Sequence, residues 1–289
     1  TWNHASAIFN DNTLDFLSDG FEIKRHSLSG ALGTYFYPNE TTKIFLDLST
    51  GFRAPNIDDL GKVFIKDQFL TVPNSQLVPE HAYNFSLGIS KKIDFKNAQF
   101  SFSSSSFFTI LDNVITKQSL EINGSSLIYY DSNYYEILAN QNSESGIVYG
   151  LSGSLSIIFL KNLKFHSSLC YTRGIIKKTQ VPMSHIPPLF GKLNLNYNFK
   201  KFEFQILNNF NAEKINKLFG QGNTDNPLEA SPMGYPSWWV INTQVGYQHR
   251  GSLNLSLGLY NLLDVHYKVF ASGISAPGRS IMASAKLSF

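Results

Sequence analysis

The sequence predicts an all-β protein, a transmembrane antiparallel β-barrel of which about 11 strands are visible. Three observations predict this fold class: a charge-poor and aromatic-rich composition, a two-residue alternation of apolar and polar side chains, and a regular exchange of short and long connections. Charged residues make up 16% of the 289 residues, and 24 Phe, 14 Tyr and 3 Trp are present. A soluble protein has about 25% charged residues, so this composition favours a protein that faces lipid.

The apolar residues are not gathered into a transmembrane helix. No apolar run approaches the roughly 18 residues that such a helix needs, because Ser, Asn, Gly and Thr interrupt the hydrophobic stretches. Helices and closed barrels are the two structures that cross a bilayer with every backbone group hydrogen-bonded. Of these two structures, the closed barrel is therefore the one that this composition allows.

The alternation is clearest at the C-terminus, where Ile281, Ala283, Ala285, Leu287 and Phe289 share one face of a strand. Mostly polar side chains occupy the positions between them. Comparable alternation recurs at residues 44–53, 83–89, 99–103, 151–157, 164–171, 193–199, 241–248 and 253–260, and a less regular one at residues 26–37. Such a period marks strands with one apolar face.

The same alternation assigns side chains to lipid or to the lumen. We predict that lipid contacts residues 44, 46, 48, 193, 195, 197, 253, 255, 257, 285, 287 and 289. We predict that the lumen contains the side chains of Asp47, Arg53, Asn194, Asn196 and Ser284. A register shift of one residue would exchange the two sets.

Short and long connections alternate along the chain. Tight turns are expected at residues 37–40, 91–96, 159–162, 198–201 and 248–251, and long loops at 11–25, 55–80, 113–145, 177–187, 213–236 and 265–277. Transmembrane barrels have this plan, with short periplasmic turns and long extracellular loops. We therefore expect the loops at 55–80 and 113–145 on one side of the membrane and the turns on the other.

A soluble β-sandwich is the alternative, because its strands also alternate. Two features argue against it: the two faces are divided sharply across ten segments, and aromatic residues gather near strand ends, where interfacial girdles lie. Trp238 and Trp239 are expected in the outer girdle.

Several short motifs resemble those of TonB-dependent outer-membrane receptors. Gly51-Phe52-Arg53-Ala54-Pro55-Asn56 resembles the family's "FRAP" box, and residues 72–80 resemble the "NPNL-x-PE" box that follows it. Residues 182–188 resemble a "P-x-x-x-IPP" segment, residues 260–267 an "NLFD-x-x-Y" element, and residues 272–279 a "PGR" lead into the last strand. Five such motifs in the family's order are fairly specific.

The resemblance implies a bacterial outer-membrane barrel of 22 strands, filled by an N-terminal plug that contacts TonB. Residues 1–289 would then be the C-terminal half of the barrel, in contact with outer-membrane lipid, and the plug is not present in this chain. The terminal Phe289 resembles the signal that the barrel-assembly machinery recognises.

Two charged residues are the first candidates for a site. Asp47 and Arg53 are placed in the lumen, because a charge on the lipid face would cost about 2–4 kcal/mol at the bilayer midplane. They either line the transport path or form an ion pair or hydrogen-bond network with a neighbouring strand or the plug. We favour the network.

Tyrosine pairs in the loop at 113–145 are the second candidates. Tyr129, Tyr130, Tyr134 and Tyr135 offer flat apolar area with a polar tip, suited to stacking on a sugar, catechol or porphyrin. The alternative is that they form a hairpin projecting beyond the membrane.

Met183 and His185 could supply soft axial ligands at an extracellular loop. They lie in the segment that resembles the "IPP" motif, where the family varies, so we favour a structural role. Family members that bind haem often carry a His between the first two motifs, and residues 56–72 contain none.

No other chemistry is indicated. The chain shows no catalytic constellation and no metal site, and its single cysteine, Cys170, excludes a site built from several cysteines. No cofactor is expected. The net charge of +3 with scattered Lys and Arg does not indicate nucleic acid. An outer-membrane phospholipase is the realistic enzyme, but its smaller barrel would need fewer strands.

The leading hypothesis is therefore TonB-dependent active import of a scarce, bulky nutrient: a ferric siderophore, haem or a cobalamin-like chelate. The alternatives are an unplugged diffusion porin and a SusC-like importer of glycans or peptides. The second would have longer loops.

Overall fold

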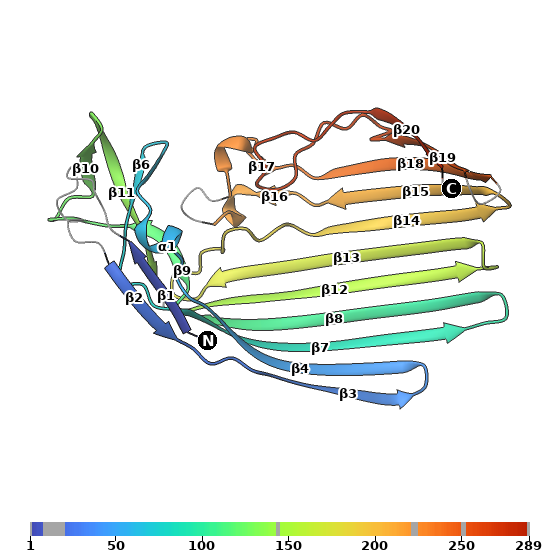
Figure 1. Cartoon of the computed structure of the whole chain (residues 1–289), viewed down its shortest axis with the longest axis horizontal. Helices are drawn as coiled ribbons and strands as arrows, with labels where there is room; N and C mark the ends of the chain where they lie inside the picture. Colours follow the sequence, from blue (N-terminus) through green and yellow to red (C-terminus); the bar gives the residue numbers. More distant parts are fainter. Residues whose placement is uncertain (1, 8–20, 143–144, 221–224, 250–252, 288–289) are drawn as a thin grey trace.

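The computed structural model describes residues 2–7, 21–142, 145–220, 225–249 and 253–287. Their largest sheet is antiparallel and has 11 strands; we call it the wall (Figure 1). Its strands are β3 (Ala31–Asn39), β4 (Thr42–Arg53), β7 (Glu80–Asp94), β8 (Ala98–Asp112), β12 (Ser145–Phe159), β13 (Leu163–Ile176), β14 (Phe190–Phe199), β15 (Phe202–Asn211), β18 (Trp238–His249), β19 (Leu253–Tyr260) and β20 (Ser280–Leu287). The predicted number of strands is confirmed.

The wall is an open sheet. Its strand order is β20-β19-β18-β15-β14-β13-β12-β8-β7-β4-β3, so each wall strand pairs with its sequence neighbours within the wall. In the part of the chain that the structure describes, the edge strands β3 and β20 each pair with one wall strand. An open sheet with an unpartnered C-terminal strand is what half of a larger barrel implies, and the described residues do not form a closed small barrel.

The two predicted faces are confirmed by the register. Ile44 pairs with Ile89, Leu195 with Phe165 and Ile206, and Leu257 with Val245 and Ala283. These residues share one face, which we call the apolar face. Asp47, Arg53, Asn194, Asn196 and Ser284 lie on the opposite, polar face. Phe289 lies outside the described residues.

The assignment of both tryptophans to one girdle is wrong for Trp238. Trp239 lies on the apolar face and stacks on Phe210 with ring centroids 5.3 Å apart. Trp238 lies on the polar face and packs against Tyr267, with ring centroids 4.5 Å apart. Consecutive residues of a strand point to opposite faces, so one of the two had to point inwards.

Connections of different length lie at opposite ends of the wall. Figure 1 shows the short turns at one end of the strands and the long connections at the other. In the three-residue connection between Phe159 and Leu163, Leu160 and Lys161 both have positive φ (47° and 65°). Two successive residues of positive φ are typical of hairpin turns, whose twist matches that of the strands. The predicted sidedness is confirmed, although residues 250–252 of the last turn lie outside the described part.

The long connections at 54–79 and 113–144 fold into a second sheet, which we call the cap sheet. It contains β5 (Phe64–Lys66), β6 (Phe69–Val72), β9 (Ile115–Ser119), β10 (Leu127–Tyr130) and β11 (Asn133–Asn142), with the short helix α1 (Ile57–Gly61) nearby. The prediction of plain loops at 55–80 and 113–145 is therefore wrong. The strands were missed because β6 pairs in parallel with β11, about 67 residues later in the chain, and local sequence does not encode so distant a partner.

The buried apolar clusters of the described residues lie in and beside the cap sheet. Leu70, Val72, Ile137 and Ala139 are almost fully buried on one of its faces, where Tyr130 and Tyr135 pack beside them. A second small cluster joins Leu60 of α1 to Leu77. These residues hold two loops together above the wall.

The described residues of the remaining long connections, 177–189, 212–220, 225–237 and 261–279, form what we call the loop cluster. It contains the small sheet of β16 (Lys214–Ile215) and β17 (Gly234–Tyr235) and two 3₁₀ turns, η2 (Asn216–Leu218) and η3 (Pro227–Glu229). At the N-terminus, β1 (Trp2–Ala7) pairs with β2 (Phe21–His26). β2 begins inside the loop predicted at 11–25, which corrects that boundary. No helix among the described residues is long and apolar enough to cross a membrane.

Candidate functional site

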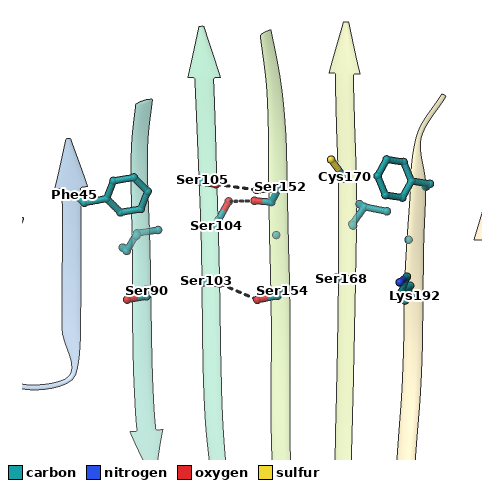
Figure 2. A pocket seen from close by; sticks show the side chains of 15 residues that line it. Phe45, Ser90, Ser103, Ser104, Ser105, Ser152, Ser154, Ser168, Cys170 and Lys192 are labelled. Atoms are coloured by element: carbon teal, nitrogen blue, oxygen red, sulfur yellow. Dashed lines mark hydrogen bonds between the residues drawn. The ribbon is translucent and has the colours of Figure 1, made fainter. Parts of the chain in front are cut away.

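The polar face of the wall contains a hollow of about 340 Å³. Its floor consists of small side chains from β8 and β12, which Figure 2 shows in the middle of the view. The hydroxyls of Ser103 and Ser154 lie 2.8 Å apart, and those of Ser105 and Ser152 also lie 2.8 Å apart. The serine hydroxyls of the two strands thus form hydrogen bonds with each other.

Larger side chains border the hollow. Phe45 lies on one side, and Cys170 and Lys192 lie on the other (Figure 2). Phe190, the cross-strand partner of Cys170, also borders the hollow. The ring of Phe45 covers Gly88, where a Cβ atom would come within 2.1 Å of it. The hollow exists because serine and glycine separate two aromatic rings, which leaves room for a polar partner inside the barrel.

Sequence reasoning missed this hollow. Its signal in the sequence is the run Ser103–Ser106, which the register places beside Ser152 and Ser154. Only the pairing of β8 with β12 shows that the two groups of serines meet.

Arg53 lies at the end of β4 and contacts two carboxylates. Its Nε donates to Glu80, the cross-strand partner at the start of β7, and its Nη1 donates to Asp59 at 2.5 Å. Asp59 belongs to α1. This helix begins at Ile57, because Asn56 and Asp59 form a reciprocal capping box at its N-terminus. This geometry favours the ion-pair interpretation of Arg53.

Asp47 lies on the same face, six residues earlier in β4. Its carboxylate accepts a hydrogen bond from the hydroxyl of Ser49 at 3.2 Å. The structure therefore places the two charged candidates in separate local networks.

Four of the five family-like motifs meet in two pairs, the first through the ion pair of Arg53 with Glu80. Asn74 of the second motif donates from Nδ2 to the carbonyl of Asn140 at 2.7 Å, and its backbone N–H donates to Leu60 at 2.9 Å. In the later pair, Asn261 is 3% exposed and its Nδ2 donates to Pro277, while Asp264 accepts from the Arg279 N–H at 2.7 Å. These motif residues fix how the loops leave and re-enter the wall.

The tyrosines divide into two pairs at the β10–β11 hairpin. Tyr129 and Tyr134 are direct cross-strand partners with centroids 5.1 Å apart, and they are 61% and 71% exposed. Tyr130 and Tyr135 pack against the buried cluster of the cap sheet. The hairpin interpretation fits all four, and the exposed pair alone is placed to contact a ligand.

Met183 and His185 do not form a pair of ligands. The sulfur of Met183 lies 3.4 Å from the Cβ position of Gly146, against the wall. The side chain of His185 is 70% exposed, and its backbone N–H donates to Asp225 Oδ1 at 2.7 Å. His185 also has a positive φ of 60°, a conformation that this hydrogen bond helps to hold.

Asp225 and Lys214 are the buried polar residues that connect the loop cluster. Asp225 is fully buried and also accepts from the Gly220 N–H at 2.7 Å, whereas Lys214 donates to the Ile186 carbonyl. Burial lowers the pKa of Lys214, an effect that Asp225 opposes. Burial likewise raises the pKa of the neighbouring Tyr235. Sequence reasoning missed both Lys214 and Asp225, since neither belongs to a motif.

Within the described ranges, no three His, Cys, Asp or Glu side chains gather closely enough to hold a metal ion. The arrangement is a polar face of the wall with two packed groups of loops at one of its ends.

Comparison with known proteins identifies the family. A model described as "TonB dependent receptor-like, beta-barrel" matches residues 2–262. The probable TonB-dependent siderophore receptor PirA of Acinetobacter baumannii is 24% identical over 301 residues, which covers 96% of the chain and 38% of that protein. The probable hemoglobin and hemoglobin-haptoglobin-binding protein 4 of Haemophilus influenzae is 22% identical over 275 residues, covering 92% and 27%. The chain thus spans well under half the length of these curated relatives, which are named as receptor and binding proteins rather than enzymes.

Solved structures show the same fold. The siderophore receptor PirA from Acinetobacter baumannii matches with a TM-score of 0.68 at 18% identity, over 94% of this chain and 41% of that one. The copper transporter OprC gives 0.68 at 18% identity, over 93% and 40%. A mutant of the ferric enterobactin receptor PfeA from Pseudomonas aeruginosa gives 0.67 at 18% identity, again over 93% and 40%. The open wall shares the fold of these barrels. Because the family model matches most of the chain, the chain belongs to the TonB-dependent receptor family and forms part of its β-barrel.

Proposed function

We propose that this chain forms part of an outer-membrane receptor that imports a scarce, bulky metal chelate in a TonB-dependent step. The observation that carries the proposal is the family match over residues 2–262. A ferric siderophore is the substrate class that we put first, because one relative is named a siderophore receptor. Haem and a cobalamin-like chelate rank lower, since residues 56–72 lack the His that haem receptors often carry there.

The proposed division of labour follows the two ends of the wall. The cap sheet and the loop cluster would capture the chelate outside the cell, with Tyr129 and Tyr134 available for stacking on an aromatic ligand. The polar face would line the interior, where a plug that contacts TonB would lie against the hollow between Phe45 and Phe190.

Further strands of the same receptor would close the wall. An edge strand in hydrocarbon leaves N–H and C=O groups without partners, at a cost of several kcal/mol each. Both β3 and β20 present such edges. A closed barrel of 22 strands would remove them.

The experiment is to purify the full-length receptor from iron-limited cells and to identify its bound ligand by absorption spectroscopy and mass spectrometry. Uptake of that ligand is then measured with and without TonB. Import that requires TonB and saturates with ligand supports the proposal. Import that is indifferent to TonB, with leakage of small sugars, would establish the porin instead. A requirement for a surface lipoprotein would favour the SusC-like importer.

A further inference from the structure

The turn end of the wall carries an excess of positive charge. Five exposed lysines, which we call the turn-end lysines, lie in or beside three of the short turns: Lys91, Lys96, Lys161, Lys200 and Lys201. Lys92 and Lys164 lie at the same end, but they point to the polar face and are not counted with them. Among the described residues near the short turns, the carboxylates are Glu40, Asp94 and Glu203. The lysines therefore outnumber the carboxylates at this end.

Most of the turn-end lysines have no side-chain partner among the described residues. The ammonium group of Lys200 lies 5.3 Å from the ring centroid of Phe199. The side chains of the other four form no ion pair or hydrogen bond with another residue in the described ranges.

The loop end is different. Arg53 contacts Asp59 and Glu80, Lys268 contacts Glu229 at 2.9 Å, and Lys214 donates to a carbonyl. Several cations at that end are thus neutralised or hydrogen-bonded by the protein itself. The turn-end lysines need an anion from outside the protein to neutralise their charge.

Aromatic rings lie just inside the turn-end lysines. On the apolar face, Tyr197 lies 6.3 Å from Phe204, and Phe202 lies 5.0 Å from Tyr247. Phe95 meets Phe100 edge to face at 5.6 Å near the β7–β8 turn. Aromatic belts of this kind sit at the headgroup level of a bilayer. The lysines beyond the belt are therefore placed among the phosphates, where a long side chain can extend its ammonium group.

We propose that the turn end of the wall binds the head groups of anionic glycerophospholipids in the leaflet that it meets. The aromatic belt would lie at the glycerol level, and the turn-end lysines would surround the phosphates. The inference rests on the proposed placement of the chain in the outer membrane, with the short turns in the periplasm. Charge complementarity selects an anionic lipid over a zwitterionic one, because the zwitterionic head group brings its own ammonium group to the lysines.

The test uses the full-length receptor in detergent and native mass spectrometry with phosphatidylglycerol or phosphatidylethanolamine as the probe. The turn variant carries Lys91→Gln, Lys96→Gln, Lys161→Gln and Lys201→Gln. The matched control carries the same change in charge at the loop end: Lys62→Gln, Lys177→Gln, Lys178→Gln and Lys217→Gln. Heat-dependent gel mobility checks that each barrel is folded.

We expect the wild type and the control to retain phosphatidylglycerol over phosphatidylethanolamine, and the turn variant to retain it at least about tenfold less. Arginine at the same four positions should preserve binding and provides a second variant if the glutamine variant does not fold. Retention should also fall as salt rises from about 50 mM to about 500 mM. Equal retention by the turn variant, equal loss in the control, or insensitivity to salt would overturn the proposal.

As a second readout, each protein is sedimented with peptidoglycan. If the turn variant no longer sediments with peptidoglycan but still retains phosphatidylglycerol, the lysines bind the cell wall and the lipid assignment is overturned. The outcome is separate from that of the transport experiment, because no substrate is present. A receptor that imports a chelate without selecting anionic lipid would contradict this inference alone.

Discussion

The wall and the cap sheet place the same residue types in opposite ways. On the wall, Leu151 and Leu257 are 54% and 52% exposed, whereas Leu70 and Ile137 of the cap sheet are 0% and 1% exposed. The wall presents its apolar side chains outwards to lipid, and the cap sheet hides them from water. An apolar side chain is stable wherever water is absent, so the surrounding solvent decides which face of a sheet becomes apolar.

The two sheets also differ in how they are assembled. Each wall strand pairs with its neighbours in the sequence of wall strands, through turns or loops. The cap sheet instead joins two loops through the parallel pair of β6 and β11. The wall is therefore specified by local alternation, and the cap sheet by contacts between distant segments.

The largest expected effect is in the core of the cap sheet. Ile137→Ala should destabilise this sheet by about 2–5 kcal/mol, because it leaves a cavity among well-packed neighbours. Leu151→Ala on the wall is the control and should cost less, since lipid chains can fill the space. Hydrogen exchange of the cap-sheet amides measures the first change and unfolding of the barrel the second. Equal costs would contradict the difference in solvent.

The faces of the wall are tested by adjacent residues of β12. Leu155→Arg should destabilise the barrel by about 2–4 kcal/mol, because it places a charge on the lipid face. Ser154→Arg should cost much less, since its neighbours are the polar side chains of the interior. Urea unfolding in lipid vesicles gives both values. A larger cost at Ser154 would reverse the two faces.

Close packing within the wall is tested at Gly150. A Cβ atom there would lie 2.5 Å from both the Phe107 ring and the Tyr171 carbonyl, whereas nothing lies within 4 Å of the Cβ position of Gly51. Gly150→Ala should therefore cost about 1–3 kcal/mol through overpacking, and Gly51→Ala should be nearly neutral. The same unfolding assay compares them. Equal tolerance would mean that β12 and β13 can separate locally.

The smallest effect is a pH dependence of the loop cluster. Burial lowers the pKa of Lys214 from its ordinary 10.5, so the folded cluster disfavours the protonated amine. Between the lowered value and 10.5, the unfolded cluster binds more protons, and stability rises with pH. Protease resistance of residues 212–237 should increase across this window, and Lys214→Met should remove the increase. A fall in resistance with rising pH would contradict the sign.

The sequence by itself determined the wall. The alternation at Ile281–Phe289 and its repeats predicted the strands, and parity predicted that Asp47 and Leu48 point to opposite faces. Turn lengths predicted which connections share an end of the wall. All of this follows from interactions between neighbours in the chain, which a period of two records directly.

Tertiary structure alone decided the rest. The loop at residues 113–145 contains strands because it pairs with residues 69–72, and the hollow exists because Ser103–Ser106 meets β12. Asp225 became a buried anchor because it joins its own loop to the loop that carries His185, and Trp238 packs against Tyr267 from a distant connection. Each of these contacts joins segments that lie far apart in the sequence. No local pattern records such a contact, so only the folded chain brings these side chains together.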